Sequence, residues 1–112
     1  MLVRENLEIK VCGNKFPTNA LAVCQLQIDY MGFIFHEESP RNVENFEIFD
    51  VLNKASLEGF SPKRVGVFVS KTEDEVLNKV RKHNLQIVQA HGLESPLFCQ
   101  KLKEEGLEVW KV

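Results

Sequence analysis

The sequence predicts an α/β fold in which five parallel strands alternate with four helices. Short apolar runs rich in β-branched residues recur five times along the 112 residues. Most of these runs are continuously apolar, as is typical of strands that are covered on both faces. The segments between them have helical periodicity, and such alternation favours parallel strands joined by right-handed crossovers.

Each apolar run defines one predicted strand. The first run ends in Cys12, which is followed by a glycine and a polar loop. The last run reaches the end of the sequence, so the predicted order both begins and ends with a strand. We expect the five strands over residues 7–12, 30–35, 64–69, 85–91 and 108–112.

Capping signals mark several helix ends. Thr72 and Glu75 have the spacing of a capping box. Ser95 precedes a proline, which is typical of an N-cap and a first helical turn, and Gly106 is suited to a helix end. We expect His83 to face solvent in a last turn, where a cation interacts well with the helix dipole. The predicted helices cover residues 18–26, 43–55, 72–83 and 95–105.

The length predicts a single domain over residues 1–112, and two architectures fit its pattern. One is a five-stranded, doubly wound open sheet of the flavodoxin type. The other is the first half of an eight-stranded βα barrel, which makes the chain a partial barrel domain. The periodicity alone does not choose between them.

Composition argues against several classes of protein. The net charge of −2, with acids and bases interleaved, lacks the basic face that nucleic-acid binding requires. The apolar runs are too short to span a membrane, and the first residues lack the pattern of a secretory signal, so we expect a cytoplasmic protein. Three widely spaced cysteines without a Cys-x-x-Cys pair favour reduced thiols over disulfides or a zinc site.

The candidate site lies where the strands end. Parallel strands bring their carboxyl ends to one edge, and α/β folds place their chemistry there. Cys12 ends the first strand, and Lys10 lies on the same strand face. Arg41 follows the second strand and carries a planar fork of donors suited to a carboxylate or a phosphate. Gln89 and His91 are two residues apart on the fourth strand and therefore point to the same side.

Four ordered blocks of residues carry a resemblance to a known family. They are Lys-Val-Cys-Gly at 10–13, Tyr-Met-Gly-Phe-Ile-Phe at 30–35 with Ser-Pro-Arg at 39–41, Val-Gly-Val-Phe-Val at 65–69, and Gln-Ala-His-Gly at 89–92 with Glu-Ser-Pro at 94–96. In this order and spacing the chain resembles the phosphoribosylanthranilate isomerases of tryptophan biosynthesis. The resemblance runs from about residue 8 to the C-terminus and covers the N-terminal half of the family's βα barrel.

The resemblance implies an isomerase that carries out an Amadori rearrangement of N-(5-phosphoribosyl)anthranilate without metal or organic cofactor. A general acid protonates the sugar ring oxygen, and a general base removes the C2 proton of the Schiff base. Cys12 corresponds to the general base. Arg41 corresponds to the residue that meets the anthranilate carboxylate, and we assign Gln89, His91 and Lys10 to substrate binding. A thiol acts as a base only as the thiolate, so we expect Lys10 or Lys15 to favour the anion.

The resemblance also implies that part of the family's machinery lies outside this chain. The aspartate general acid of the family ends the sixth strand, and its phosphate-binding amides follow strands seven and eight. We therefore expect little turnover from the chain alone. Its expected partners are a phosphoribosylanthranilate-type small molecule and either the missing C-terminal half or a second copy in a homodimer. The alternative is a non-catalytic half-barrel that serves as a binding or oligomerisation module.

Overall fold

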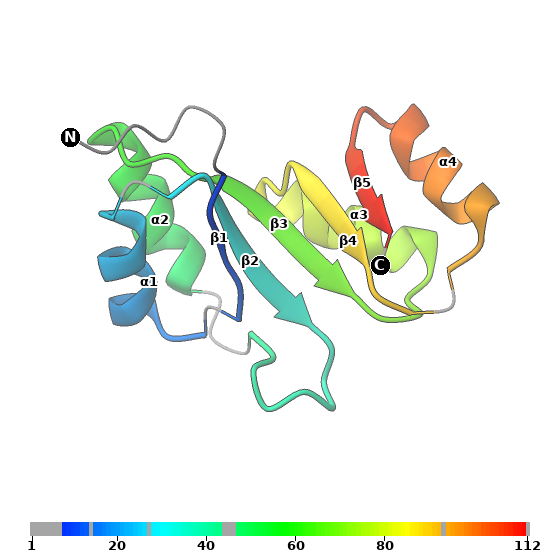
Figure 1. Cartoon of the computed structure of the whole chain (residues 1–112), viewed down its shortest axis with the longest axis horizontal. Helices are drawn as coiled ribbons and strands as arrows, with labels where there is room; N and C mark the ends of the chain where they lie inside the picture. The colour runs from blue at the N-terminus through cyan, green and yellow to red at the C-terminus, as the bar shows by residue number, and fades with distance from the viewer. Residues whose placement is uncertain (1–7, 14, 27, 44–46, 93, 112) are drawn as a thin grey trace.

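The structure of the chain is a computed structural model, and it describes residues 8–13, 15–26, 28–43, 47–92 and 94–111. Within these residues strands and helices alternate as predicted (Figure 1). Their bounds are β1 Lys10–Val11, α1 Pro17–Cys24, β2 Tyr30–Phe35, α2 Glu47–Leu57, β3 Lys63–Phe68, α3 Glu73–His83, β4 Ile87–Ala90, α4 Pro96–Glu104 and β5 Glu108–Lys111.

All strand pairs are parallel, and the sheet has the order β1-β2-β3-β4-β5. A flavodoxin-like sheet reverses its strand order near the first strand, so this alternative is wrong. Each strand instead adds beside the preceding one, which is how a βα barrel grows. Figure 1 shows the strands side by side in chain order, with α1 and α2 at one end of the sheet and α4 at the other.

The main core lies between the helices and one face of the sheet, here called the outer face. Met31, Phe33 and Phe35 alternate along β2 and are buried against helical side chains. Apolar burial of this kind is the main stabilising contribution to a small domain. The other members of the core include Ala20 and Cys24 of α1, Ile48, Phe49 and Leu52 of α2, Val76 and Leu77 of α3, and Leu102 of α4.

The opposite face of the sheet, here called the inner face, is defined by Lys10, Tyr30, Gln89 and Trp110. The Lys10 ammonium donates to Gln89 Oε1, although β1 and β4 are not neighbours in the sheet. The rings of Tyr30 and Trp110 meet edge to face with centroids 5.1 Å apart, which joins β2 to β5. Because side chains of distant strands touch across it, the sheet curves toward the inner face. This curvature is what a half-barrel requires.

Several element ends differ from the sequence-based expectation. β1 ends at Val11 and β4 at Ala90, so Cys12 and His91 lie just beyond their strands. The second helix was expected from residue 43 but begins at Glu47. Residues 44–46 lie outside the described residues, as do residues 7 and 112 at the ends of the first and fifth predicted strands. Val43 is buried, and its N–H donates to the carbonyl of Ile34 at 2.8 Å, because the chain after β2 returns to the edge of that strand before α2 begins.

The structure confirms the two N-caps and corrects the placement of His83. The Thr72 and Ser95 hydroxyls accept from the N–H groups of Glu75 and Phe98. His83, however, is 4% exposed and stacks on Phe49 with ring centroids 4.1 Å apart. The expectation of a solvent-facing His83 was wrong because position 83 continues the apolar face of α3, seven residues after the buried Val76.

None of the helices in the described part of the chain is long and apolar enough to cross a membrane.

Candidate active site at the carboxyl edge of the sheet

Cys12 lies directly after β1, half-buried beside β2. Its thiol faces Gly32, where a Cβ would come within 2.8 Å of Sγ. Real Cβ atoms do not approach a sulfur this closely, so a residue with a side chain at position 32 would displace the thiol. Glycine in the middle of a buried strand normally weakens the strand. Here it leaves the space that the Cys12 thiol occupies, which explains why position 32 is a glycine.

Arg41 is bonded to the loop that begins at Cys12. Its Nη2 donates to the main-chain carbonyl oxygen of Cys12 at 2.6 Å. The guanidinium covers Gly13, where a Cβ would lie 2.2 Å from both Nε and Nη2. Gly13 also has a φ of +77°, which glycine adopts without strain. Two predicted site residues, far apart in sequence, are therefore held together at the carboxyl edge.

The two lysines expected near Cys12 make contacts elsewhere. Lys10 donates to Gln89 and lies over the ring of Trp110, with Nζ 5.7 Å from the ring centroid. Lys15 donates to the carbonyl of Pro40 at 3.0 Å, so it adds a second bond between the loops after β1 and β2. These contacts place Lys10 in the wall of the inner face, whereas Lys15 bridges the two loops.

His91 is exposed at the carboxyl end of β4. Its main-chain N–H donates to the carbonyl of Phe68 at 2.9 Å and extends the β3–β4 ladder by one bond. The structure thus brings Arg41 to Cys12 and Lys10 to Gln89. The main-chain bond of His91 is instead to Phe68 of β3.

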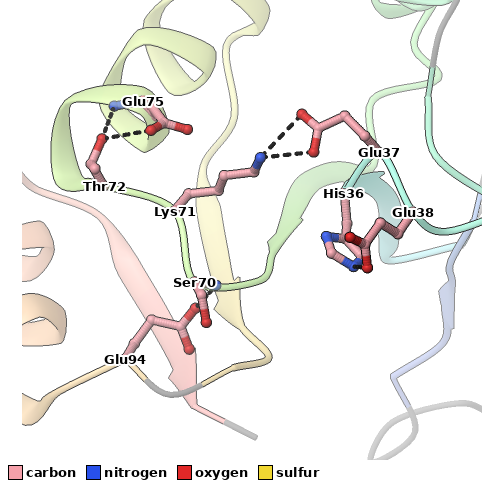
Figure 2. Close-up of polar contacts among 8 residues, drawn as sticks. All are labelled: His36, Glu37, Glu38, Ser70, Lys71, Thr72, Glu75 and Glu94. Atoms are coloured by element: carbon pink, nitrogen blue, oxygen red, sulfur yellow. Dashed lines mark hydrogen bonds and ion pairs between the residues drawn. The ribbon is translucent and has the colours of Figure 1, made fainter.

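An ion pair links the loops after β2 and β3. Lys71 Nζ lies 2.8 Å and 3.1 Å from the two carboxylate oxygens of Glu37 (Figure 2). The hydrogen bond from Lys71 lowers the pKa of Glu37, and the same bond raises the pKa of Lys71. Figure 2 shows the Lys71 side chain extended across the space between the two loops.

Glu94, in the loop after β4, is bonded to the loop after β3, to its own loop and to the end of β5. Its Oε2 accepts from the N–H of Ser70 at 2.7 Å, and its Oε1 accepts from the N–H of Gly92 at 2.7 Å. Lys111 Nζ lies 3.3 Å from Oε1 and also donates to the carbonyl of Gly92. The sequence alone gives Glu94 no site role, because the spacing of Ser70, Gly92, Glu94 and Lys111 does not indicate that they meet.

A separate groove lies on the outer face. It has a volume of about 620 Å³, and Phe35, Phe68 and Val43 form its apolar part beside the Lys71–Glu37 pair. Because β2 alternates its side chains, Phe35 points away from the inner face. The groove is therefore distinct from the surroundings of Cys12 and Arg41.

In the described ranges, no group of three or more His, Cys, Asp or Glu side chains is placed to hold a metal ion.

Known proteins match this chain over almost its whole length. The profile of the N-(5'-phosphoribosyl)anthranilate (PRA) isomerase family matches residues 9–112. The N-(5'-phosphoribosyl)anthranilate isomerase of Parabacteroides distasonis is 40% identical over 103 residues, which are 92% of this chain and 46% of that protein. The chain therefore spans about half the length of this relative.

Solved structures match the fold. Monomers of the dimeric phosphoribosylanthranilate isomerase of Thermotoga maritima superpose with a TM-score of 0.77 at 32% identity, over 93% of this chain and 51% of theirs. A phosphoribosyl anthranilate isomerase in complex with reduced 1-(o-carboxyphenylamino)-1-deoxyribulose 5-phosphate gives a TM-score of 0.76 at 30% identity, over 93% of this chain and 52% of that one. Sequence profile, relatives and fold agree, and the chain belongs to the N-(5'-phosphoribosyl)anthranilate isomerase family.

Proposed function

We propose that this chain supplies the half of a phosphoribosylanthranilate isomerase active site that carries the general base and the carboxylate-binding arginine. The observation that supports this most directly is the bond between Arg41 and the Cys12 carbonyl, which brings both residues to one edge of the sheet. The reaction would be the isomerisation in tryptophan biosynthesis that converts N-(5'-phosphoribosyl)anthranilate to 1-(2-carboxyphenylamino)-1-deoxyribulose 5-phosphate.

In the proposed reaction, Cys12 removes a proton from carbon. An acid first protonates the furanose ring oxygen, the C1–O bond breaks, and the nitrogen lone pair forms the C1=N bond of a Schiff base. The Cys12 thiolate then takes the C2 proton, and the electron pair of that C–H bond forms an enolamine. Protonation of C1 and loss of the C2 hydroxyl proton to water or a base then give the ketone at C2. No net oxidant or reductant is needed, which suits a site built from acid–base groups.

Arg41 is proposed to orient the anthranilate carboxylate. A guanidinium has five N–H donors, so a bond to the Cys12 carbonyl leaves a pair of them for a bidentate contact with a carboxylate. Since the same side chain holds the Cys12 carbonyl, carboxylate and base would be positioned relative to each other. The bound product analogue of the related isomerase also carries a carboxyphenylamino group, which supports this assignment.

We further propose that turnover needs a second half-barrel. On the family resemblance, the general acid and the phosphate-binding loops come from strands six to eight. An acid and a base are each worth about two to four orders of magnitude in rate. We therefore expect little isomerisation by the isolated 112-residue chain, and expect Gln89, His91 and Lys10 to contact substrate only in the completed barrel.

The test is to complete the barrel. The chain is co-expressed with the C-terminal half of the Parabacteroides distasonis relative, and the loss of anthranilate-adduct fluorescence is followed. Cys12→Ser should lower kcat at least about a hundredfold, the low end of the effect of losing a catalytic base. Cys99→Ser, a change of the same chemistry on α4, should leave kcat unchanged. Unchanged turnover in Cys12→Ser would remove Cys12 from the mechanism, and family-like rates from the chain alone would refute the need for a second half.

The sheet edges support a second candidate function. β1 and β5 are the edge strands of the described sheet, and parallel edges of this kind invite pairing with another chain. A non-catalytic half-barrel that self-associates, with a homodimer as its assembly, would cover both edges. Light scattering separates the two candidates: a stable dimer that takes up no C-terminal half would favour the second, and a monodisperse monomer at high concentration would exclude it.

A further inference from the structure

We propose that Glu94 is a positioning residue that holds His91 in place at the substrate side of the sheet. This inference rests on the proposed function, in which His91 contacts the substrate. It is carried by the geometry of the loops after β3 and β4 and of the end of β5, because Glu94 bonds to Ser70, Gly92 and Lys111.

The main chain is fixed on both sides of His91. Its own N–H donates to the carbonyl of Phe68 at 2.9 Å, and the N–H of the next residue, Gly92, donates to Glu94 at 2.7 Å. The second peptide group includes the carbonyl of His91, so the Cα of His91 lies between two anchored peptides. Glu94 provides one of these two anchors.

The carboxylate of Glu94 is almost completely enclosed, with 2% of its side chain exposed. Burial by itself would raise its pKa, but backbone N–H donors, those of Ser70 and Gly92 among them, outweigh burial and lower the pKa. A charged carboxylate that accepts several N–H bonds is a rigid support, because charge-assisted bonds are stronger than neutral ones.

The residues around Glu94 are adapted to this close packing. Ser70 has a φ of +50°, a left-handed conformation that costs a residue with a side chain about 1–2 kcal/mol. Its N–H is held there by Glu94. Gly92 leaves no room for a Cβ, which would lie 2.7 Å from Ser70 Oγ and 3.1 Å from Glu94 Oε2. A strained serine and an obligatory glycine therefore both meet the same carboxylate.

The chain itself provides the first test. In amide NMR spectra, Glu94→Gln should shift the Ser70 and Gly92 signals, because the neutral amide cannot accept from both N–H groups and Lys111. The imidazole signals of His91 should move with them. Glu104→Gln, the same charge change at an exposed position of α4, should move none of these signals. Unchanged His91 signals beside shifted Ser70 and Gly92 signals would overturn the proposal, since Glu94 would then support only its own loop.

The second test uses the completed barrel. Glu94→Gln should raise KM about tenfold, because a small misplacement of a binding group weakens substrate binding. It should leave kcat within about threefold, since Glu94 does not touch the reacting atoms. An unchanged KM would overturn the proposal. If the wild-type completed barrel is inactive, the proposed function fails, and the NMR comparison still decides the role of Glu94.

A second variant covers the case in which Glu94→Gln does not fold. Lys111→Met removes the ammonium that bonds both Glu94 and the Gly92 carbonyl but keeps both N–H bonds to Glu94. We expect it to shift the Gly92 and His91 signals in the same direction by a smaller amount. Shifts confined to β5 would contradict the proposal.

Discussion

The guanidinium of Arg41 donates to the main-chain carbonyl of Cys12 at 2.6 Å and lies over Gly13. The loop after β2 thereby holds the loop after β1. Similar contacts continue along the edge. Lys71 and Glu37 join the loops after β2 and β3, and Glu94 joins the loop after β4 to the loop after β3 and to Lys111 of β5. Each pair of successive loops in the half-barrel is thus connected by a charged side chain.

Gly13→Ala should displace Arg41 and destabilise the protein. The left-handed φ alone costs an alanine about 1–2 kcal/mol. The new Cβ also meets the guanidinium at 2.2 Å, so the bond to Cys12 is lost and roughly another 1–3 kcal/mol with it. Gly59→Ala provides the matched control, because Gly59 has a φ of +97° and nothing within 4 Å of its Cβ position. In urea unfolding, equal losses for the two variants would contradict the role of Arg41 as a brace.

Arg64→Met should lower the free energy of unfolding by about 2–4 kcal/mol, because the buried carbonyl of His83 and the partly buried amide of Asn53 would lose their donor. Arg64 is buried on the outer face, where Nη1 donates to the carbonyl of His83 at 2.9 Å and Nη2 donates to Asn53 Oδ1 at 2.7 Å. Methionine keeps most of the apolar packing but offers no donor. The neighbouring Lys63 is exposed, and Lys63→Met should change stability by less than about 0.5 kcal/mol. Equal effects of the two substitutions would show that Arg64 does not join α2 to α3.

Stability should fall in mild acid because of His83. Burial, followed by the nearby charges of Lys79, Lys82 and Arg64, lowers the pKa of His83 to about 4. The unfolded chain keeps the ordinary histidine pKa of about 6.5. Between these values the unfolded state binds a proton that the folded state does not, so the free energy of unfolding should drop by about 2–3 kcal/mol as the pH falls from 6.5 to 4.

The control for this pH dependence is His83→Phe, which keeps a ring against Phe49 but cannot titrate. Urea unfolding at several pH values should show a flatter profile for the variant above about pH 5.5, where the carboxylates with lowered pKa values, Glu37 and Glu94, are ionised in both the folded and the unfolded state. Identical pH profiles for wild type and variant would mean that His83 is accessible to protons in the folded protein.

Tyr30 should titrate far above an ordinary tyrosine. The hydrogen bond to Glu8, together with burial and the charges of Glu8, Glu108 and Asp29, raises its pKa to about 12. As the chain has a single tyrosine, near-ultraviolet absorbance follows this group alone. Glu8→Gln should move the midpoint down toward the usual value of about 10. Glu58→Gln, a similar change away from the inner face, should leave it unchanged, and a midpoint near 10 in the wild type would contradict the Tyr30–Glu8 bond.

Much of the fold could be predicted from sequence because its signals are local. The continuous apolar run of β2 and the capping residues Thr72 and Ser95 act within a few positions of the chain, and the structure confirms them. The error at His83 has the opposite origin. A charged residue in a last turn suits solvent by local rules, but Phe49 from another helix covers it.

The sequence by itself determined the alternation of strands and helices, the position of Cys12 and His91 at strand ends and that of Arg41 in the loop after β2, since periodicity and parallel connections decide these. Only the tertiary structure decided the strand order, the curvature toward the inner face and the partners of each side chain. Lys10 donates a hydrogen bond to Gln89, and Arg41 donates one to the carbonyl of Cys12. Glu94 accepts hydrogen bonds from the N–H groups of Ser70 and Gly92. Such contacts depend on distances between loops that are far apart in the chain, and no local pattern encodes them.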